Sequence, residues 1–283
     1  MPETHGRLAL EFEYDPPSAR TLLHLKEQRQ PLKVVRAFHS GEGEALVHLH
    51  NLSGGVLAGD RLSLEFNVGP RAHAQVTSTG STRLYRSRLE AQSAECLTSV
   101  RVAEDALLEY LPDPVIPFAG ARYKQNTVVD LERGAGLFWW ETVAPGREAR
   151  GEVFSYDALR LGFELRGGGI PLAIERNQLN PSLLALSSLA RMGPYRYFSS
   201  FYICRMGVAD SAWRTLEKQL FELAGTLSSP VIIWGLGRLP AHGFVVRALS
   251  FRGREIASGL IEFWRVAKLA LYGRVAVIPR KVY

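Results

Sequence analysis

Cysteine is almost absent from this chain of 283 residues, which contains only Cys96 and Cys204. The two lie far apart and match no spacing typical of a metal or redox site, so we expect two buried free thiols rather than a disulfide. Long apolar runs are missing as well: no stretch approaches the ~18 residues of a membrane-spanning helix. The N-terminus also lacks the apolar segment of a secretory signal. These absences predict a cytoplasmic chain that does not contact membranes.

Motifs that identify common enzyme classes are missing too. The sequence contains no G-x-S-x-G elbow, no H-E-x-x-H helix, no phosphate-binding G-x-x-x-x-G-K loop and no C-x-x-C pair. Histidine is scarce, with 7 residues in the whole chain. We therefore predict a protein without catalytic activity.

His48 and His50 stand two positions apart in a segment expected to form a strand, so their side chains point the same way. Imidazole binds transition metals, yet a bare H-x-H pair is also typical of a polar strand face. A metal-dependent hydrolase would need a third convergent ligand and an open coordination position, and the sequence offers none at a diagnostic spacing. We expect any metal to be held weakly, or in transit past carboxylates and water, with none bound tightly.

Net charge is modest, at +6, and spread along the chain. The densest basic cluster is formed by Arg83, Arg86 and Arg88. A nucleic-acid-binding protein usually combines a basic stripe with stacking aromatic residues, and no such motif is present. The basic residues therefore indicate either a solvated face or a surface that docks onto an acidic protein partner.

Apolar residues make up 46% of the chain, enough to build a core, and alternate with polar ones over long stretches. Such alternation predicts half-buried strands, because successive side chains of a strand point to opposite faces. Glycine and proline clusters separate the alternating segments. The pattern predicts a mostly β protein, built either as stacked antiparallel sheets or as an elongated body like a β-helix. The clearest alternating segments are residues 8–14, 62–68, 159–165 and 244–248.

Two helices are predicted, both late in the chain. Residues 210–224 carry apolar side chains at helical spacing, with Asp210 as the N-cap and Gly225 just beyond the end. Residues 255–272 repeat the pattern, and Gly273 ends the run. No internal repeat or long linker is visible, so we expect one domain over residues 1–283.

Several ordered motifs carry a family resemblance. The first is HNLSGGVLAGDRL at residues 50–62, followed by TSTGSTRLYRS at residues 77–87 and LEYLPDPVIPFAGA at residues 108–121. The later ones are WWE at residues 139–141, Gly146-Arg147, Gly151-Glu152, Glu175-Arg176 and Pro279-Arg280. In order and spacing they resemble the UreD family of urease accessory proteins, called UreH in some organisms. The resemblance extends from about Pro31 to the end of the chain.

Some positions depart from the family pattern. Asn51 and Leu52 replace two prolines after His50, and Ala58 replaces a glycine before Asp60. Arg83 stands where the family has lysine. These changes leave the family assignment intact, but the turn around His50 need not have the usual shape.

The resemblance implies a function in urease maturation. UreD proteins are non-catalytic chaperones that bind apo-urease, recruit accessory protein F and through it the GTPase accessory protein G. They help to deliver nickel and carbon dioxide to the urease centre during metallocentre assembly. The implied fold is an elongated, mostly β body with two helices. No resident cofactor is implied, since nickel is cargo in transit.

Three carboxylates fall on acidic positions of the family pattern: Asp60, Glu141 and Glu175. A carboxylate among apolar residues is costly unless it is paired or lines a wet cavity. We expect the three to line an internal nickel channel, with His50 as an additional weak metal contact. The alternative is structural: Asp60 would shape a glycine-rich turn, and Glu175 would pair with an arginine such as Arg147.

A second set of residues is predicted to bind partners. The helix at residues 255–272 and the basic tail are expected to contact accessory protein F, with Trp264, Arg280 and Tyr283 as contact residues. The main rival function is a non-catalytic β-sandwich binding module with Trp139-Trp140 as an aromatic platform. Strand alternation would place one of these two rings inward, which makes the platform thin.

Overall fold

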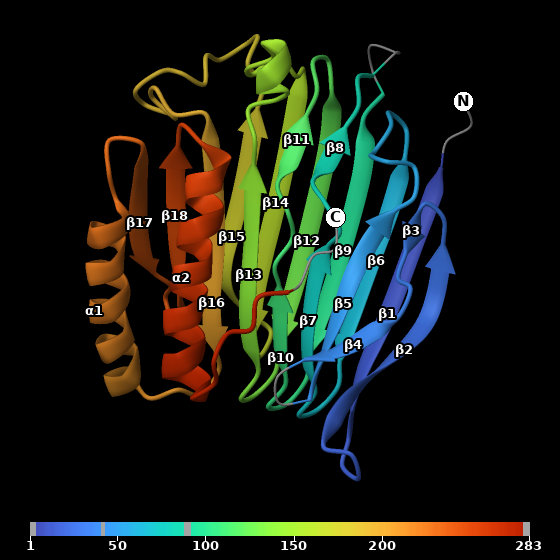
Figure 1. The fold of residues 1–283 in the computed structure, drawn as a ribbon, viewed down its shortest axis with the longest axis vertical. Helices are drawn as coiled ribbons and strands as arrows, with labels where there is room; N and C mark the ends of the chain where they lie inside the picture. Colours follow the sequence, from blue (N-terminus) through green and yellow to red (C-terminus); the bar gives the residue numbers. More distant parts are fainter. Residues whose placement is uncertain (1–3, 41–42, 88–91, 280–283) are drawn as a thin grey trace.

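Two large β-sheets stacked face to face form the body of the computed structural model, which describes residues 4–40, 43–87 and 92–279 (Figure 1). Within these residues a seven-stranded sheet has, in spatial order, β15 (Ile170–Leu179), β14 (Ala158–Gly167), β12 (Arg122–Leu131), β9 (Ala94–Val102), β6 (Arg61–Val68), β1 (His5–Asp15) and β2 (Arg20–Arg29). The eleven-stranded sheet has β17 (Ile232–Arg238), β18 (Gly243–Ser250), β16 (Tyr197–Arg205), β13 (Gly136–Val143), β10 (Leu107–Tyr110), β7 (His73–Ser78), β5 (Glu44–Asn51) and β3 (Leu32–Lys33). The short strands β4 (Ala37–Ser40), β8 (Thr82–Leu84) and β11 (Val115–Pro117) pair beside this path.

The chain winds back and forth between the sheets. It passes from β6 to β7, from β9 to β10 and from β12 to β13, entering the seven-stranded sheet and then the eleven-stranded sheet each time. Neighbouring strands of these windings are therefore parallel, as in β6–β9–β12 and β7–β10–β13. Antiparallel pairs occur toward the two ends, for example β1–β2 and β16–β18. The prediction of a mostly β, stacked-sheet body like a β-helix is confirmed.

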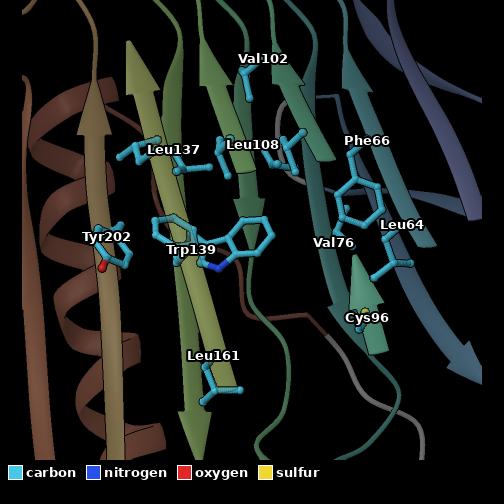
Figure 2. Packing of buried hydrophobic residues seen from close by; sticks show 14 of the residues in the cluster. Leu64, Phe66, Val76, Cys96, Val102, Leu108, Leu137, Trp139, Leu161 and Tyr202 are labelled. Atoms are coloured by element: carbon cyan, nitrogen blue, oxygen red, sulfur yellow. The ribbon is translucent and has the colours of Figure 1, made fainter. Parts of the chain in front are cut away.

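Apolar residues of the alternating segments fill the space between the sheets (Figure 2). Trp139 lies at the centre of this core, 1% exposed, with its ring stacked on that of Tyr110 at a centroid distance of 3.9 Å. Trp140 points to the opposite face of β13 and packs edge-on against Trp264. The tryptophan pair therefore forms no exposed aromatic platform. Both cysteines are free and buried, as predicted.

Both predicted helices are present and cover the outer face of the eleven-stranded sheet near β16 and β18 (Figure 1). Helix α2 (Gly253–Tyr272) ends as expected, with Gly273 in the left-handed conformation at φ 65°. Helix α1 (Asp210–Leu227) runs past the predicted stop at Gly225, which is exposed. Leu227, beyond this glycine, packs against the apolar cluster under the helices, so packing offsets the ~1 kcal/mol that a glycine costs inside a helix. No helix in the described ranges is both long and apolar enough to cross a bilayer.

A buried ionic cluster fastens α2 to the sheet. Glu109 on β10 is fully buried; it accepts hydrogen bonds from Trp264 Nε1 at 2.5 Å and Lys268 Nζ at 2.7 Å. His73 Nε2 lies 2.5 Å from the same carboxylate, and Glu44 lies 3.6 Å from Lys268. Desolvation opposes ionisation of Glu109, but the hydrogen bonds and charges of His73 and Lys268 outweigh it and hold its pKa below the ordinary value. This cluster ties three strands to one helix.

Candidate functional site

Three adjoining hollows begin between the two sheets and end beside β17 and β18, past the edge of the seven-stranded sheet. We call them the inner cavity, of about 260 Å³, the neck, of about 20 Å³, and the outer cavity, of about 460 Å³. The inner cavity and the neck share Trp139 and Glu141 as walls. The neck and the outer cavity share Glu175 and Ser200, among others. The three hollows therefore form a series from the middle of the body to the side where β17 and β18 lie.

Glu141 stands where the inner cavity meets the neck. The side chains of its strand, β13, point alternately to the helix-covered face and to the interior. Those of Trp139 and Glu141 both lie on the interior side. Gln125 Nε2 donates a hydrogen bond to Glu141 Oε1 at 2.7 Å, and Trp139 Nε1 donates a longer one at 3.3 Å. Desolvation raises the pKa of Glu141 to about 7, against the lowering effect of these donors, and the negative charge of Glu175 adds to the rise. Near neutral pH this carboxyl exchanges a proton readily.

Glu175 stands where the neck meets the outer cavity. It lies on β15 beside Phe163 and reaches across the sandwich to the opposite sheet. The hydroxyl of Tyr202 donates to Glu175 Oε2 at 2.5 Å, and that of Ser200 donates to Oε1 at 3.2 Å. Arg247 Nη2 donates to Oε2 at 3.0 Å. Glu175 therefore closes a polar bridge between the two sheets.

The neck between the two carboxylates has room for about one water molecule. A volume of about 20 Å³ is close to the space that one water occupies. Its walls are aromatic, and the rings of Phe163 and Tyr202 stack at a centroid distance of 4.3 Å. A hydrated divalent cation must shed water to pass such an opening. Carboxylate oxygens on both sides can replace the lost water ligands and exchange quickly, as hard oxygen donors do.

The inner cavity is polar on one side. His50 and Asp113 line it near the turns, and Cys96 and Gln125 line it within the sheets. Burial raises the pKa of the Cys96 thiol to about 11, so the thiol stays protonated at neutral pH. The hydroxyl of Thr127 is buried in this wall and has no hydrogen-bond partner within the protein. A wall with such unpaired polar groups suits water or a hydrated ion better than an apolar molecule.

Asp60 lies apart from these hollows. It is 3% exposed, and its Oδ2 accepts a hydrogen bond from the backbone N–H of Leu57 at 2.9 Å. Its own backbone oxygen accepts a hydrogen bond from the Glu95 N–H. Asp60 thus shapes the glycine-rich turn, which is the structural alternative given above. The fold brings Glu141 and Glu175 together but not Asp60.

The arginine partner of Glu175 differs from the one suggested by the sequence. Arg147 pairs with Glu152 in the same loop, and Glu175 pairs instead with Arg247 of β18. Arg147 lies five residues from Glu152, whereas Arg247 comes from a strand 72 residues away. The alternation of residues 244–248 places Arg247 on the face opposite the helices, but only the fold shows what lies there.

The predicted partner-binding residues have different outcomes. Trp264 is fully buried between α2 and the sheet, with its indole N–H bound to Glu109. It therefore cannot touch a partner directly in this conformation. Arg280 and Tyr283 lie outside the described residues. Across the described part of the chain, no three histidine, cysteine, aspartate or glutamate residues are grouped to hold a metal ion.

A family model described as UreD urease accessory protein matches residues 4–283. The chain belongs to the UreD family. A UreD protein of Herpetosiphon aurantiacus is 45% identical over 99% of this chain and 96% of its own length. One of Trichormus variabilis is 39% identical, covering 98% and 95%. Another, of Pseudomonas fluorescens, is 31% identical, covering 99% and 95%. All three are named urease accessory protein UreD, so this UreD protein belongs to the machinery of urease maturation.

The family motifs also supply residues that sequence analysis did not single out. The segment at residues 108–121 contains Glu109, the centre of the ionic cluster, and Asp113, which lines the inner cavity. A charged residue inside an apolar strand was the available signal for Glu109. Gln125 carried no comparable signal, because a polar residue on a strand is usually solvated.

Proposed function

We propose that this chain is a non-catalytic, cytoplasmic assembly factor for urease. In this proposal it binds apo-urease, recruits accessory protein F and through it the GTPase accessory protein G, and conducts nickel toward the urease active site. Nickel is the cargo and passes without a tight resident site. Family membership supports the role in urease maturation.

One observation carries the proposed route: Glu141 and Glu175 stand at the two ends of a neck that joins two larger cavities. Each carboxylate faces a cavity large enough for several waters, whereas the neck has room for about one. An ion that loses water in the neck meets an oxygen ligand before and after it. The resemblance named Asp60, Glu141 and Glu175, and the geometry that aligns Glu141 and Glu175 is a separate argument for a path past these two.

Accessory protein F is proposed to bind the outer faces of the helices and the C-terminal segment. Phe221 of α1 is 72% exposed and Leu269 of α2 is 57% exposed, although both lie on helices whose other faces are fully packed. Val275 follows α2 and is exposed as well. A contiguous patch of exposed apolar side chains is typical of a protein-binding surface, and the proposal places these three side chains in one such patch. No observation favours the β-sandwich binding module, since Trp139 and Trp140 provide no platform.

The proposal is tested by urease activity in cells that express the urease structural subunits and the other accessory proteins, with and without this chain, at fixed nickel. We expect activity only with the chain, at equal levels of urease protein. Glu175→Gln should lower that activity about tenfold, as the loss of a group near a metal path does. The matched control is Glu164→Gln, because Glu164 pairs with Arg166 and Arg176 away from the three hollows.

Equal activity with and without the chain would overturn the role in maturation. Full activity of Glu175→Gln, with Glu164→Gln also fully active, would remove the proposed nickel route but leave the maturation role standing. Copurification of urease with each variant shows whether the complex still forms.

A further inference from the structure

Arg247 and Glu175 form an ion pair with one end inside the protein and the other in water. The Glu175 side chain is 15% exposed, whereas that of Arg247 is 60% exposed. Glu175 is also held by the hydroxyls of Tyr202 and Ser200 and by the side-chain amide of Asn177, which donates at 2.7 Å. These three donors fix the carboxylate from the inside. Arg247 is the partner that is easier to release, because its side chain is already largely exposed to water.

The position of Arg247 lets it leave without moving a strand. The seven-stranded sheet ends at β15, while the opposite sheet continues past β16 to β18 and β17. No strand in the described ranges therefore covers the inner face of β18, where Arg247 borders the outer cavity. The side chain has free volume of about 460 Å³ beside it. This space leaves room for another rotamer of Arg247, which would release the carboxylate.

We propose that Arg247 is an intramolecular counter-ion of Glu175, which stays paired with this carboxylate and is displaced only by a divalent cation. The inference rests on the proposed function, since it describes how the outer carboxylate of the same route is regulated. With the guanidinium in place the pair is neutral and has little attraction for cations. A cation that emerges from the neck must take the same oxygen, Oε2, from which the guanidinium then departs.

The charge of an ion decides whether it can replace the guanidinium of Arg247 at Glu175. A monovalent cation offers the carboxylate no more charge than the guanidinium does, so potassium and sodium gain nothing by replacing it. A divalent cation offers twice the charge at a similar distance, and Coulomb energy scales with that product. Arg191 also lines the outer cavity and adds positive charge there. The exchange at Glu175 is thus biased against monovalent ions, whereas the positive charge of Arg191 opposes every cation in the outer cavity.

Pairing of Glu175 with Arg247 lowers the apparent affinity of this position for divalent cations. A binding site that is free for only a fraction of the time binds more weakly by that fraction. Partly exposed ion pairs are modest in strength. We therefore expect the state in which Glu175 is paired with Arg247 to be populated roughly fivefold over the unpaired state. Removing the guanidinium should therefore tighten divalent binding at this position by roughly fivefold.

The test is titration of the purified full-length chain with Ni²⁺ alone, in an excess of potassium, by calorimetry. Four proteins are compared: the unaltered chain, Arg247→Gln, Glu175→Gln and the double variant. Arg176→Gln is the matched control, because it removes the same charge one residue from Glu175 but from a side chain that pairs with Glu164. Thermal unfolding of each variant checks the fold.

We expect Arg247→Gln to bind Ni²⁺ roughly fivefold tighter than the unaltered chain, Arg176→Gln to bind equally, and Arg247→Gln to have no effect when Glu175 is already glutamine. Unchanged or absent binding in Arg247→Gln would overturn the inference. So would the same gain in Arg176→Gln or in the Glu175→Gln background, since either result would reflect overall charge. A failure of the proposed function is recognised separately, by cells that activate urease without this chain.

Discussion

The ionised carboxylate of Glu141 lowers the free energy of unfolding by an amount that depends on pH. Its carboxyl is protonated in both the folded and unfolded protein at low pH, where the cost is zero. As pH rises from its ordinary pKa of 4.5 toward about 7, the unfolded chain loses the proton first, and the folded protein is destabilised. Above pH 7 both states are ionised and the penalty is constant, at roughly 3 kcal/mol.

Glu141→Gln should remove this penalty. We expect the variant to be more stable than the unaltered chain at pH 8, by up to roughly 3 kcal/mol, and equally stable or slightly weaker at pH 4.5. Urea unfolding at both values measures the difference. Glu164→Gln is a control of opposite sign, because Arg166 and then Arg176 hold the pKa of Glu164 below its ordinary value, so its loss should destabilise at neutral pH. A Glu141→Gln effect that is the same at both pH values would contradict this account.

The sequence identified individual acidic residues better than their surroundings. Asp60, Glu141 and Glu175 were predicted to line one channel, and the fold places only Glu141 and Glu175 on the neck. Asp60 carried an equal signal, yet it closes a turn through Leu57. Flanking residues show that a carboxylate lies near apolar side chains. They do not show which strand faces it, so a turn and a cavity wall look alike in sequence.

Helix α2 should depend on Glu109 for its docking. Glu109→Gln leaves the buried Lys268 with the longer, 3.6 Å contact to Glu44, and removing one member of a buried ion pair costs about 3–5 kcal/mol. The exposed pair of Glu262 and Arg265 on the same helix provides the control, and Glu262→Gln should change stability by less than about 0.5 kcal/mol. The free energy of unfolding in urea distinguishes the two. A loss in Glu109→Gln as small as that of the control would mean that the ionic cluster is not what holds α2.

Elements were predicted more reliably than their partners. The strands at residues 62–68 and 159–165 and both helices follow from local periodicity, because each buries one face. Parallel pairing between β6 and β9 does not follow, since alternation is the same in parallel and antiparallel strands. Gly225 gave a false stop because tertiary packing of α1 outweighs local preference. The ionic cluster joins Glu44 to Lys268 across most of the chain, and no local pattern encodes that contact.

The proposed nickel route can be tested without altering a carboxylate. Ser200 borders both the neck and the outer cavity. Ser200→Leu should fill the neck and reduce nickel-dependent urease activation by about tenfold or more, because the opening has room for only one water. Urease activity in cells at limiting nickel is the measurement, with copurification of urease as a check on assembly.

Ser200→Ala is the matched control, since it removes the same hydroxyl from Glu175 and leaves the neck open. We expect this variant to retain most activity. Equal loss in both variants would show that the hydrogen bond matters and the opening does not, and full activity of Ser200→Leu would place the nickel path elsewhere.

The winding of the chain between the sheets limits how this interior can open. Each turn of the coil is closed covalently, because the strands of one sheet continue into those of the other, as β9 does into β10 and β12 into β13 (Figure 1). Two unconnected sheets could move apart, but sheets joined by a winding chain cannot. The space between them therefore widens only when side chains move. On the proposed route, nickel therefore travels along the axis from turn to turn. The proposed exchange between Arg247 and a divalent cation lies at the last, incomplete turn, where it needs no movement of a strand.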